Sequence, residues 1–373
     1  MSEALKLLLV AGARPNFMKV APLIHAIERR NSSRAVSSRP IDCCLVHTGQ
    51  HYDVAMSEIF FRELGIPQPH VNLGVGSGSH AVQTANVMLG FEKVCEERRP
   101  DWVVVFGDVN STVACSLVAA KLGIRVAHVE AGLRSFDRTM PEEINRVVTD
   151  ALADILFAPS EDAMKNLAHE GVPEARIRLV GNIMIDSLIA NLAKAKQSSA
   201  LQRFSVEPDT FVYVTLHRPA NVDSRSNLAA IAAELKKLSH QLPVVFPVHP
   251  RTRKMFSEFG LDLAGHNGFR LAEPIGYHDS IWLTQNARLV LTDSGGLQEE
   301  ATYFQTPCLT LRPNTERPVT IEIGSNRLTK VETLSADLGD VLSQSRRIGN
   351  IPPLWDGKTA GRIVEELSRA SFE

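Results

Sequence analysis

The feature that most constrains the fold is a repeated alternation of short apolar runs with stretches of helical composition. Because parallel strands are joined by long crossovers, usually helices, this alternation is typical of parallel sheets covered by helices on both faces. The rhythm restarts at Phe211, so the sequence predicts an α/β fold with two doubly wound domains. The predicted strands span residues 5–11, 41–48, 102–106, 125–129, 155–158, 177–180, 211–215, 243–247, 269–272, 288–292 and 308–311.

Helices are predicted between these strands, and the chain ends in an amphipathic stretch with Ile363, Val364 and Leu367 on its apolar side. We expect the joint between the two domains near residues 181–187, and we interpret the polar stretch 194–202 as a surface connection. The predicted helices span residues 17–30, 80–99, 111–122, 226–241, 251–259, 277–286 and 359–371.

The composition limits the partners of the protein. Among its 373 residues, 40 Lys and Arg balance 42 Asp and Glu, so no global field would recruit nucleic acid or an anionic membrane. No apolar run approaches the roughly 20 residues of a membrane span, and the run at residues 7–11 is too short for a signal-peptide core. We therefore predict a cytoplasmic protein that binds neither nucleic acid nor membrane.

Metal and redox chemistry are not favoured by the sequence. Its five cysteines lack metal-type spacing and its 12 histidines form no H-E-x-x-H pair, so we predict reduced thiols and no metal site. The first predicted strand leads into Gly12-Ala13-Arg14-Pro15-Asn16, which has one glycine where a dinucleotide fingerprint has three. We therefore expect no nicotinamide and no other cofactor. A G-x-S-x-G nucleophile elbow is also absent from the sequence.

Residues 289–304 have the pattern of a strand, a glycine turn and the start of a helix. A helix start has unpaired backbone N–H groups and a partial positive charge, and Gly295 and Gly296 would let an anion approach that backbone closely. Glu299 and Glu300 are expected in the first helical turn, within reach of the hydroxyls of an attached sugar. The stretch fits a nucleotide diphosphate, although an ordinary turn with Ser294 as N-cap has the same pattern.

Ionisable and glycine residues follow one predicted strand after another. Ligands of open parallel sheets bind outside the carboxyl ends of the strands, so these residues define a candidate cleft between the domains. Donors suit a diphosphate there, and carboxylates suit proton transfer and an oxocarbenium-like centre. The donors are Arg14, Lys19, His217, Arg317 and the amides of Ser294, Gly295 and Gly296; the carboxylates are Asp108, Glu130 and Glu142. Glu142 also fits a surface acid at a helix start, because it follows Pro141.

The segments after these strands match a known family across nearly the whole chain. They are GARPNFMKVAPL (12–23), GQH (49–51), GDVNST (107–112), HVEAGLRS (128–135), PEEINR (141–146), LHR (216–218), PVHPRT (247–252), LTDSGGLQEEA (291–301) and TERPVT (315–320). In these motifs the chain resembles the non-hydrolysing UDP-N-acetylglucosamine 2-epimerases. The resemblance implies a homodimer with the fold of type B glycosyltransferases. Residues 1–184 would form a Rossmann-like domain with the catalytic carboxylates, 185–357 a Rossmann-like UDP-binding domain, and 358–373 a helix that packs back on the first domain.

The resemblance also implies a reaction that interconverts UDP-GlcNAc and UDP-ManNAc and needs no cofactor. Carbon 2 of the sugar bears no adjacent carbonyl, so the family eliminates UDP to give 2-acetamidoglucal and then adds UDP back with the proton on the opposite face. Matching positions assign the catalytic roles to Asp108, Glu130, Glu142 and His217. The positions that match nucleotide contacts are Arg14, Ser294, Gly295, Gly296, Glu300 and Arg317, and Lys19 and His249 are further candidate contacts with the UDP-sugar.

Two departures from the family pattern leave the substrate open. Asn16 stands where the family commonly has glutamate, and Pro219-Ala220 interrupts a common H-R-R-E-N segment. Both departures resemble a neighbouring subfamily that acts on UDP-2,3-diacetamido-2,3-dideoxyglucuronate, so that epimerase activity is one alternative. A UDP-sugar glycosyltransferase of the same fold and a non-catalytic nucleotide-sugar sensor are the other two.

Overall fold

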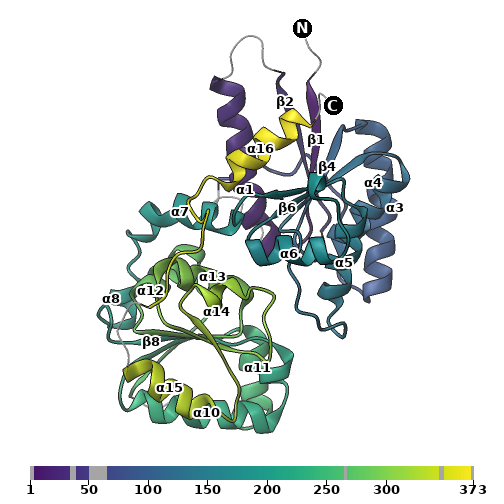
Figure 1. Cartoon of the computed structure of the whole chain (residues 1–373). Helices are drawn as coiled ribbons and strands as arrows, with labels where there is room; N and C mark the ends of the chain where they lie inside the picture. The colour runs from purple at the N-terminus through teal and green to yellow at the C-terminus, as the bar shows by residue number, and fades with distance from the viewer. Residues whose placement is uncertain (1–3, 34–38, 50–64, 264–266, 344–347, 371–373) are drawn as a thin grey trace. The chain divides into compact units, whose positions relative to one another are not determined.

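The computed structural model describes residues 4–33, 39–49, 65–263, 267–343 and 348–370, without the side chains of Arg14 and Pro15. The chain divides into two compact units, each built around one sheet (Figure 1). Unit 1 comprises Met1–Ser187 and Pro353–Glu373, and unit 2 comprises Leu188–Pro352. The described strand pairs of both sheets are parallel, so the predicted α/β class is confirmed.

Unit 1 contains seven described strands and the helices that cover them. The strands are β1 (Leu5–Ala11), β2 (Ile41–His47), β3 (Val71–Asn72), β4 (Trp102–Phe106), β5 (Arg125–Val129), β6 (Ile155–Ala158) and β7 (Ile177–Leu179). The helices are α1 (Arg14–Ser33), α3 (His80–Arg98), α4 (Asn110–Lys121), α5 (Pro141–Leu152), α6 (Glu161–His169), α7 (Ile183–Ala195) and α16 (Thr359–Arg369). The sheet order is β3-β2-β1-β4-β5-β6-β7.

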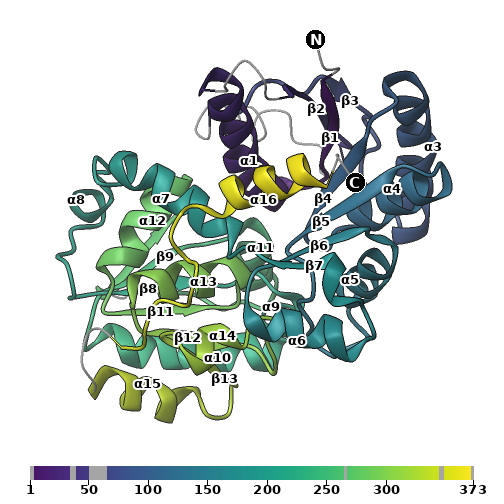
Figure 2. The same cartoon turned by 45° about the horizontal axis from the view of Figure 1, so that its top comes forward.

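The strands of unit 1 are apolar because both faces of the sheet are covered. All five residues of β4 are buried, as expected for a central parallel strand. Leu8 and Val10 of β1 face a core shared with α3, α4 and α6. Helices α1 and α16 pack together and lie away from α3 and α4 in both views (Figures 1 and 2).

Unit 2 repeats this architecture with six described strands, in the order β10-β9-β8-β11-β12-β13. The strands are β8 (Val212–Thr215), β9 (Val244–Pro247), β10 (Phe269–Ala272), β11 (Leu289–Thr292), β12 (Cys308–Leu311) and β13 (Asn326–Thr329). The helices are α8 (Ala200–Phe204), α9 (Pro219–Val222), α10 (Arg225–Ser239), α11 (Pro250–Glu258), α12 (Tyr277–Asn286), α13 (Gly295–Phe304), α14 (Val319–Glu322) and α15 (Leu334–Ser343).

Alternate residues of β8 face two separate cores in unit 2. Val212 and Val214 pack with residues of α10 and α15, whereas Tyr213 packs with residues of α8, α12 and α13. Figure 2 shows these two helix layers on either side of the sheet. The carboxyl ends of β8 and β11 lie next to each other, because the two strands pair from Leu289 with Val212 to Thr292 with Thr215.

Helix α16 returns the chain to unit 1. The Asp186 carboxylate accepts hydrogen bonds from the backbone N–H groups of Thr359 (3.2 Å) and Ala360 (2.8 Å), which caps the start of α16. Farther along the helix, Arg178 Nε lies 2.8 Å from Glu366 Oε2. The helix predicted at the end of the chain is therefore present and anchored at two points.

Several elements are absent from the sequence-based prediction. Helix α7 runs through the expected joint, and the boundary between the units falls inside it, at Ser187 and Leu188. Its sequence is apolar along most of its length, so it shows no polar face with a helical period. Strand β3 has two residues and β13 has two apolar residues among four, so neither gives a strand signal. Helices α14 and α15 were also not predicted.

Candidate functional site

The predicted anion seat in unit 2 has the geometry of a helix start after a strand. Strand β11 ends at Thr292, Ser294 is the N-cap residue, and α13 begins at Gly295. The Ser294 side chain makes no capping hydrogen bond, and Ser294, Gly295 and Gly296 are each partly exposed. The first N–H groups of α13 thus lie at a half-exposed helix N-terminus, where a bound anion is favoured.

Arg317 lies against this helix start. A Cβ atom at Gly295 would stand 3.0 Å from Arg317 Nη1 and 3.3 Å from Glu316 Oε1, so a glycine leaves the space that the guanidinium needs. Arg317 Nε lies 2.8 Å from Glu299 Oε1, and Nη1 pairs with Glu316. The predicted donors Gly295 and Arg317 are therefore brought together, and two buried carboxylates fix the direction of the arginine.

Glu299 and Glu300 lie in the second turn of α13, because the helix begins at Gly295; the expectation that they belong to the first turn was wrong. Their surroundings differ, since Glu299 pairs with Arg317 whereas Glu300 is buried beside Tyr277. Burial, with the nearby Glu299 charge, raises the pKa of Glu300 to about 8 although Tyr277 donates a hydrogen bond to it. Glu300 therefore holds its proton near neutral pH in this structure.

His217 follows β8 and lies beside Asp293, which follows β11. His217 Nδ1 is 2.8 Å from Asp293 Oδ1, and the histidine side chain is 41% exposed while the carboxylate is buried. The backbone N–H groups of His217 and Arg218 also donate to Asp293, at 3.0 and 2.9 Å. The sequence gave no sign of this role for Asp293, because its partners are more than 70 residues away in the chain.

His249 is the N-cap residue of α11, and its Nδ1 accepts a hydrogen bond from the Arg251 backbone N–H at 3.2 Å. Its ring centroid is 5.6 Å from that of His217. The two predicted histidines are therefore neighbours, and both follow strands of the same sheet.

In unit 1, Glu130 and Lys19 form a buried ion pair beside Gly107. Gly107 has φ of +63°, and a Cβ atom there would stand 2.6 Å from Lys19 Nζ and 3.1 Å from Glu130 Oε2. Glu130 also has a positive φ, of 74°, which is uncommon for a residue with a side chain. The structure therefore places Lys19, a predicted contact of the UDP-sugar, on a predicted catalytic carboxylate.

Arg146 joins Asp108 to a carboxylate that the prediction missed. Arg146 Nη2 is 2.6 Å from Asp108 Oδ2, and its Nη1 is 2.6 Å from Glu143 Oε2. Glu142, the predicted residue, is exposed, whereas its neighbour Glu143 is buried. The spacing of three residues between Glu143 and Arg146 is the sequence signal that could have indicated this pair.

Glu143 also holds the turn between β5 and α5. It accepts hydrogen bonds from the Ser135 N–H (2.9 Å), the Ser135 hydroxyl (3.0 Å) and the Phe136 N–H (2.9 Å). Burial raises the pKa of Glu143, but these backbone hydrogen bonds and Arg146 outweigh that effect and hold it below its usual value. Glu143 is therefore an ionised structural carboxylate, and Glu142 is the one of the two that solvent reaches.

A buried His128 supports the turn that carries Asp108. Its Nδ1 lies 2.6 Å from Asp150 Oδ1, and its Nε2 lies 2.8 Å from the Gly107 carbonyl oxygen. Asp150 in turn lies 2.7 Å from Arg134 Nη2. These contacts fix the backbone between β4 and α4, and with it the start of the Asp108 side chain.

The two departures from the family motifs have structural roles here. Asn16 Oδ1 accepts hydrogen bonds from the backbone N–H groups of Gly12 (3.1 Å) and Ala13 (3.0 Å), and its Nδ2 donates to the Phe106 carbonyl at 2.9 Å. Pro219 is the first residue of α9, a position that suits proline. Arg14 begins α1, but its side chain lies outside the described part of the chain.

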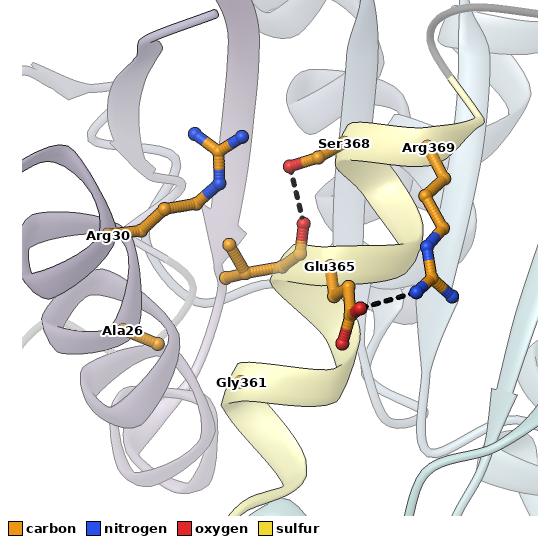
Figure 3. Close-up of a pocket in the computed structure, with 7 residues that line it drawn as sticks. Ala26, Arg30, Gly361, Glu365, Ser368 and Arg369 are labelled. Carbon is orange, nitrogen blue, oxygen red and sulfur yellow. Dashed lines mark hydrogen bonds and ion pairs between the residues drawn. The ribbon is translucent and has the colours of Figure 1, made fainter. Parts of the chain in front are cut away.

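A surface pocket lies apart from these residues, between α1 and α16 (Figure 3). Its polar groups are engaged locally: Arg30 Nη1 donates to the Arg39 carbonyl at 2.9 Å, Ser368 Oγ donates to the Val364 carbonyl at 2.7 Å, and Arg369 pairs with Glu365. The pocket is lined by Ala26, Arg30, Gly361, Val364, Glu365, Ser368 and Arg369. None of the predicted site residues lines it.

The described residues contain no group of three or more His, Cys, Asp or Glu side chains placed to hold a metal ion. All five cysteines are free, and Cys95, Cys115 and Cys308 are buried. Among the helices of the described segments, none is both long enough and apolar enough to cross a membrane.

The fold and the two clusters define a class of protein before any relative is considered. An arginine beside a half-exposed helix N-terminus suits a phosphorylated ligand, and ion-paired carboxylates on a second doubly wound domain suit acid–base chemistry. These features are those of an α/β enzyme for nucleotide-linked substrates.

Comparisons with known proteins define the family. A family model described as UDP-N-acetylglucosamine 2-epimerase matches residues 34–368. The UDP-N-acetylglucosamine 2-epimerase of Methanocaldococcus jannaschii is 43% identical over 99% of this chain and 100% of its own length. The chain therefore belongs to the UDP-N-acetylglucosamine 2-epimerase family, whose members are isomerases.

Solved structures agree with this assignment. The crystal structure of the M. jannaschii UDP-GlcNAc 2-epimerase in complex with UDP-GlcNAc and UDP has a TM-score of 0.86 and 44% identity, and the match covers 98% of this chain and 99% of that one. A UDP-glucosyltransferase from Polygonum tinctorium, at 14% identity and a TM-score of 0.59 over 99% of this chain and 94% of that one, shares the fold alone.

Proposed function

We propose that this protein interconverts UDP-GlcNAc and UDP-ManNAc as a non-hydrolysing 2-epimerase without a cofactor. The observation that carries the proposal is Arg317 held against Gly295 at the N-terminus of α13, which is a preformed seat for a diphosphate. Relatives at 43% and 39% identity bear the name of this enzyme.

Unit 2 would bind the UDP part of the substrate. The amides of Ser294, Gly295 and Gly296 and the guanidinium of Arg317 would hold phosphate oxygens, and Glu300 would accept hydrogen bonds from the ribose hydroxyls. His217 would act beside the diphosphate, and His249 would lie next to it. In the domain scheme, residues 185–357 bind UDP while residues 1–184 and the 358–373 helix carry the carboxylates.

Unit 1 would supply the chemistry at the sugar. The bond between carbon 1 and the diphosphate oxygen breaks while a carboxylate takes the proton from carbon 2, which leaves 2-acetamidoglucal and UDP. In the return step the UDP oxygen bonds to carbon 1, and a proton is delivered to the opposite face of carbon 2. We assign these proton transfers and the stabilisation of the cationic centre to Asp108, Glu130 and Glu142, with Arg14 and Lys19 as supporting cations.

Incubation of the purified protein with UDP-GlcNAc alone in deuterated water tests the reaction. We expect UDP-ManNAc to form with deuterium at carbon 2, detected by NMR and mass spectrometry. Turnover only after an acceptor is added would indicate a glycosyltransferase. Binding without turnover would indicate a nucleotide-sugar sensor.

UDP-2,3-diacetamido-2,3-dideoxyglucuronate is the second candidate substrate. A 2-epimerase of that sugar from Pseudomonas aeruginosa is 38% identical over 98% of this chain and 100% of its own length. However, the Asn16 side chain is occupied by backbone groups of its own turn, so its replacement of glutamate does not by itself indicate a different sugar. The same experiment with the diacetamido sugar compares the two substrates directly.

We also propose that the protein works as a cytoplasmic homodimer, with a UDP-sugar and neither nucleic acid nor membrane as its partner. Exposed apolar side chains gather on two helices of unit 1 that both pack on α4: α3 exposes Val82 (55%) and Leu89 (65%), and α5 exposes Ile144 (48%) and Val147 (41%). A second copy would bury this face. Light scattering should show that Leu89→Glu weakens the dimer, whereas Leu271→Glu, at an exposed site in unit 2, should leave it intact.

A further inference from the structure

The carboxylate of Asp293 is the centre of a buried hydrogen-bond cluster in unit 2. Asp293 is fully buried, and it accepts hydrogen bonds from the His217 and Arg218 backbone N–H groups and from Asn221 Nδ2 at 3.0 Å. Burial raises the pKa of Asp293, but hydrogen bonds from His217, Arg218 and Asn221 outweigh it and hold the pKa below its usual value. The carboxylate is therefore ionised at neutral pH.

An ionised carboxylate decides which ring nitrogen of His217 carries a hydrogen. A carboxylate can only accept, and His217 Nδ1 lies 2.8 Å from Asp293 Oδ1, so Nδ1 must donate. The remaining nitrogen, Nε2, belongs to a side chain that is 41% exposed. Asp293 stands two residues before α13, so the ring is tied directly to the helix start that forms the anion seat.

The neighbouring His249 has the opposite arrangement. Its Nδ1 accepts a hydrogen bond from the Arg251 N–H, so the hydrogen of the neutral ring lies on Nε2. Two histidines whose ring centroids are 5.6 Å apart are thus fixed in different tautomers by different partners. Such a difference requires a specific partner for each ring, since a free imidazole interconverts between the two forms.

We infer that Asp293 is a positioning residue for the reaction: it holds His217 through Nδ1 so that Nε2 is the ring atom that meets the diphosphate of the substrate. The inference deepens the proposed function and rests on the proposed role of His217 beside the diphosphate. It adds a residue that the sequence analysis did not assign. Asp293 acts through His217 and does not touch the substrate.

NMR of the ligand-free protein labelled with ¹⁵N in histidine tests the orientation without substrate. The His217 and His249 signals are assigned by their loss in His217→Asn and His249→Asn. At a pH where both rings are neutral, we expect a protonated Nδ1 in His217 and a protonated Nε2 in His249. A protonated Nε2 in neutral His217 would overturn the inference.

The variant Asp293→Asn tests the consequence for turnover. Its amide can donate to Nδ1 and so favours the wrong tautomer, which lowered kcat by orders of magnitude in the serine-protease case from which this argument is taken; here we expect about 100-fold. The affinity for UDP should change much less than kcat, because the amides of α13 and Arg317 remain. In a His217→Asn background, Asp293→Asn should add little further loss.

Two controls separate positioning from general damage. Asn221→Ala removes another donor to Asp293 without touching the ring, so the His217 NMR pattern should persist. An equal loss of kcat from Asp293→Asn with and without His217 would contradict the inference. If Asp293→Asn does not fold, the NMR result on the unaltered protein still decides, and it does so whether or not UDP-GlcNAc is turned over.

Discussion

The two units build the same kind of sheet but surround their working groups with opposite charges. In unit 1 the cations Lys19 and Arg146 are buried and hold the carboxylates of Glu130 and Asp108. In unit 2 the carboxylates Glu299 and Glu316 are buried and hold the cation of Arg317. A glycine makes room for each arrangement, Gly107 in unit 1 and Gly295 in unit 2.

The difference shows how one architecture can serve two halves of a reaction. In each unit the buried counter-charge fixes the direction of a charged group, which reduces the reorganisation needed when ligand binds. The exposed group then has the sign that suits its ligand: negative for proton transfer in unit 1, and positive for a diphosphate in unit 2. Exchange or loss of these pairs should therefore affect chemistry in one unit and nucleotide affinity in the other.

The largest effect is expected from the carboxylates of unit 1. Asp108→Asn or Glu142→Gln should lower kcat by about 100-fold or more and change UDP affinity little, because a proton-transfer group is lost. Arg146 keeps Glu143 as a partner, so Asp108→Asn should fold. Steady-state kinetics and calorimetry with UDP measure both quantities, and Glu161→Gln, at an exposed site on α6, is the control. Equal losses of turnover and UDP binding would assign these carboxylates to the nucleotide.

Arg317 should show the reverse pattern. Arg317→Ala should weaken UDP binding by about 30-fold, near 2 kcal/mol, because a charge-assisted contact with phosphate is lost. The variant also leaves Glu299 and Glu316 without their cation, so Arg317→Lys, which keeps the charge without the planar fork, is the better-folded comparison. Calorimetric titration with UDP provides the measurement. UDP affinity equal to that of the unaltered protein in both variants would exclude Arg317 from the seat.

Gly107 tests the space that unit 1 reserves for its ion pair. Gly107→Ala should lower the free energy of unfolding by roughly 2 kcal/mol, because it combines a positive φ with a contact on Lys19. Gly123→Ala is a matched control, since Gly123 has φ of +69° and no atom within 4 Å of the added Cβ. Urea unfolding of the two variants separates backbone strain from displacement of the Lys19–Glu130 pair. Equal losses would mean that the pair tolerates the methyl group.

Glu300 should give the smallest effect per step, visible as a pH dependence of stability. Its pKa is raised from 4.5 to about 8, so between those values the unfolded chain releases a proton that the folded chain keeps. Stability should therefore fall as pH rises through this range, by at most about 1.4 kcal/mol per pH unit, and level off above pH 8. Glu300→Gln should flatten this part of the profile and weaken UDP binding. Glu322→Gln, at an exposed site on α14, should keep the slope.

Local patterns in the sequence were sufficient for the regular elements that face both sides of a sheet. Strand β4 is an uninterrupted apolar run, and the start of α13 carries two glycines after a polar N-cap, so both could be placed from sequence. Helix α7 could not, because burial on most of its surface removes the polar stripe that reveals a helix.

The site was predicted residue by residue but not as a set of pairs. Ionisable residues after strands indicate where a ligand binds, whereas their partners depend on contacts that the fold creates. The Lys19–Glu130 pair spans 111 positions, and the Asp293 carboxylate meets an N–H group 76 positions earlier. Of two adjacent glutamates, Glu143 rather than Glu142 is buried, and only the rotation of α5 against the sheet decides which one.

The return of α16 to unit 1 has a consequence for biosynthesis. Helix α16 follows all of unit 2 in the chain, yet Asp186 caps its first turn and α1 packs along its side, as Figures 1 and 2 show. On the ribosome, the segment Leu188–Pro352 emerges complete before the helix that unit 1 needs. The earliest part of the chain therefore waits with the α16-binding side of α1 uncovered, so the order of synthesis and the order in which the two units finish folding run in opposite directions.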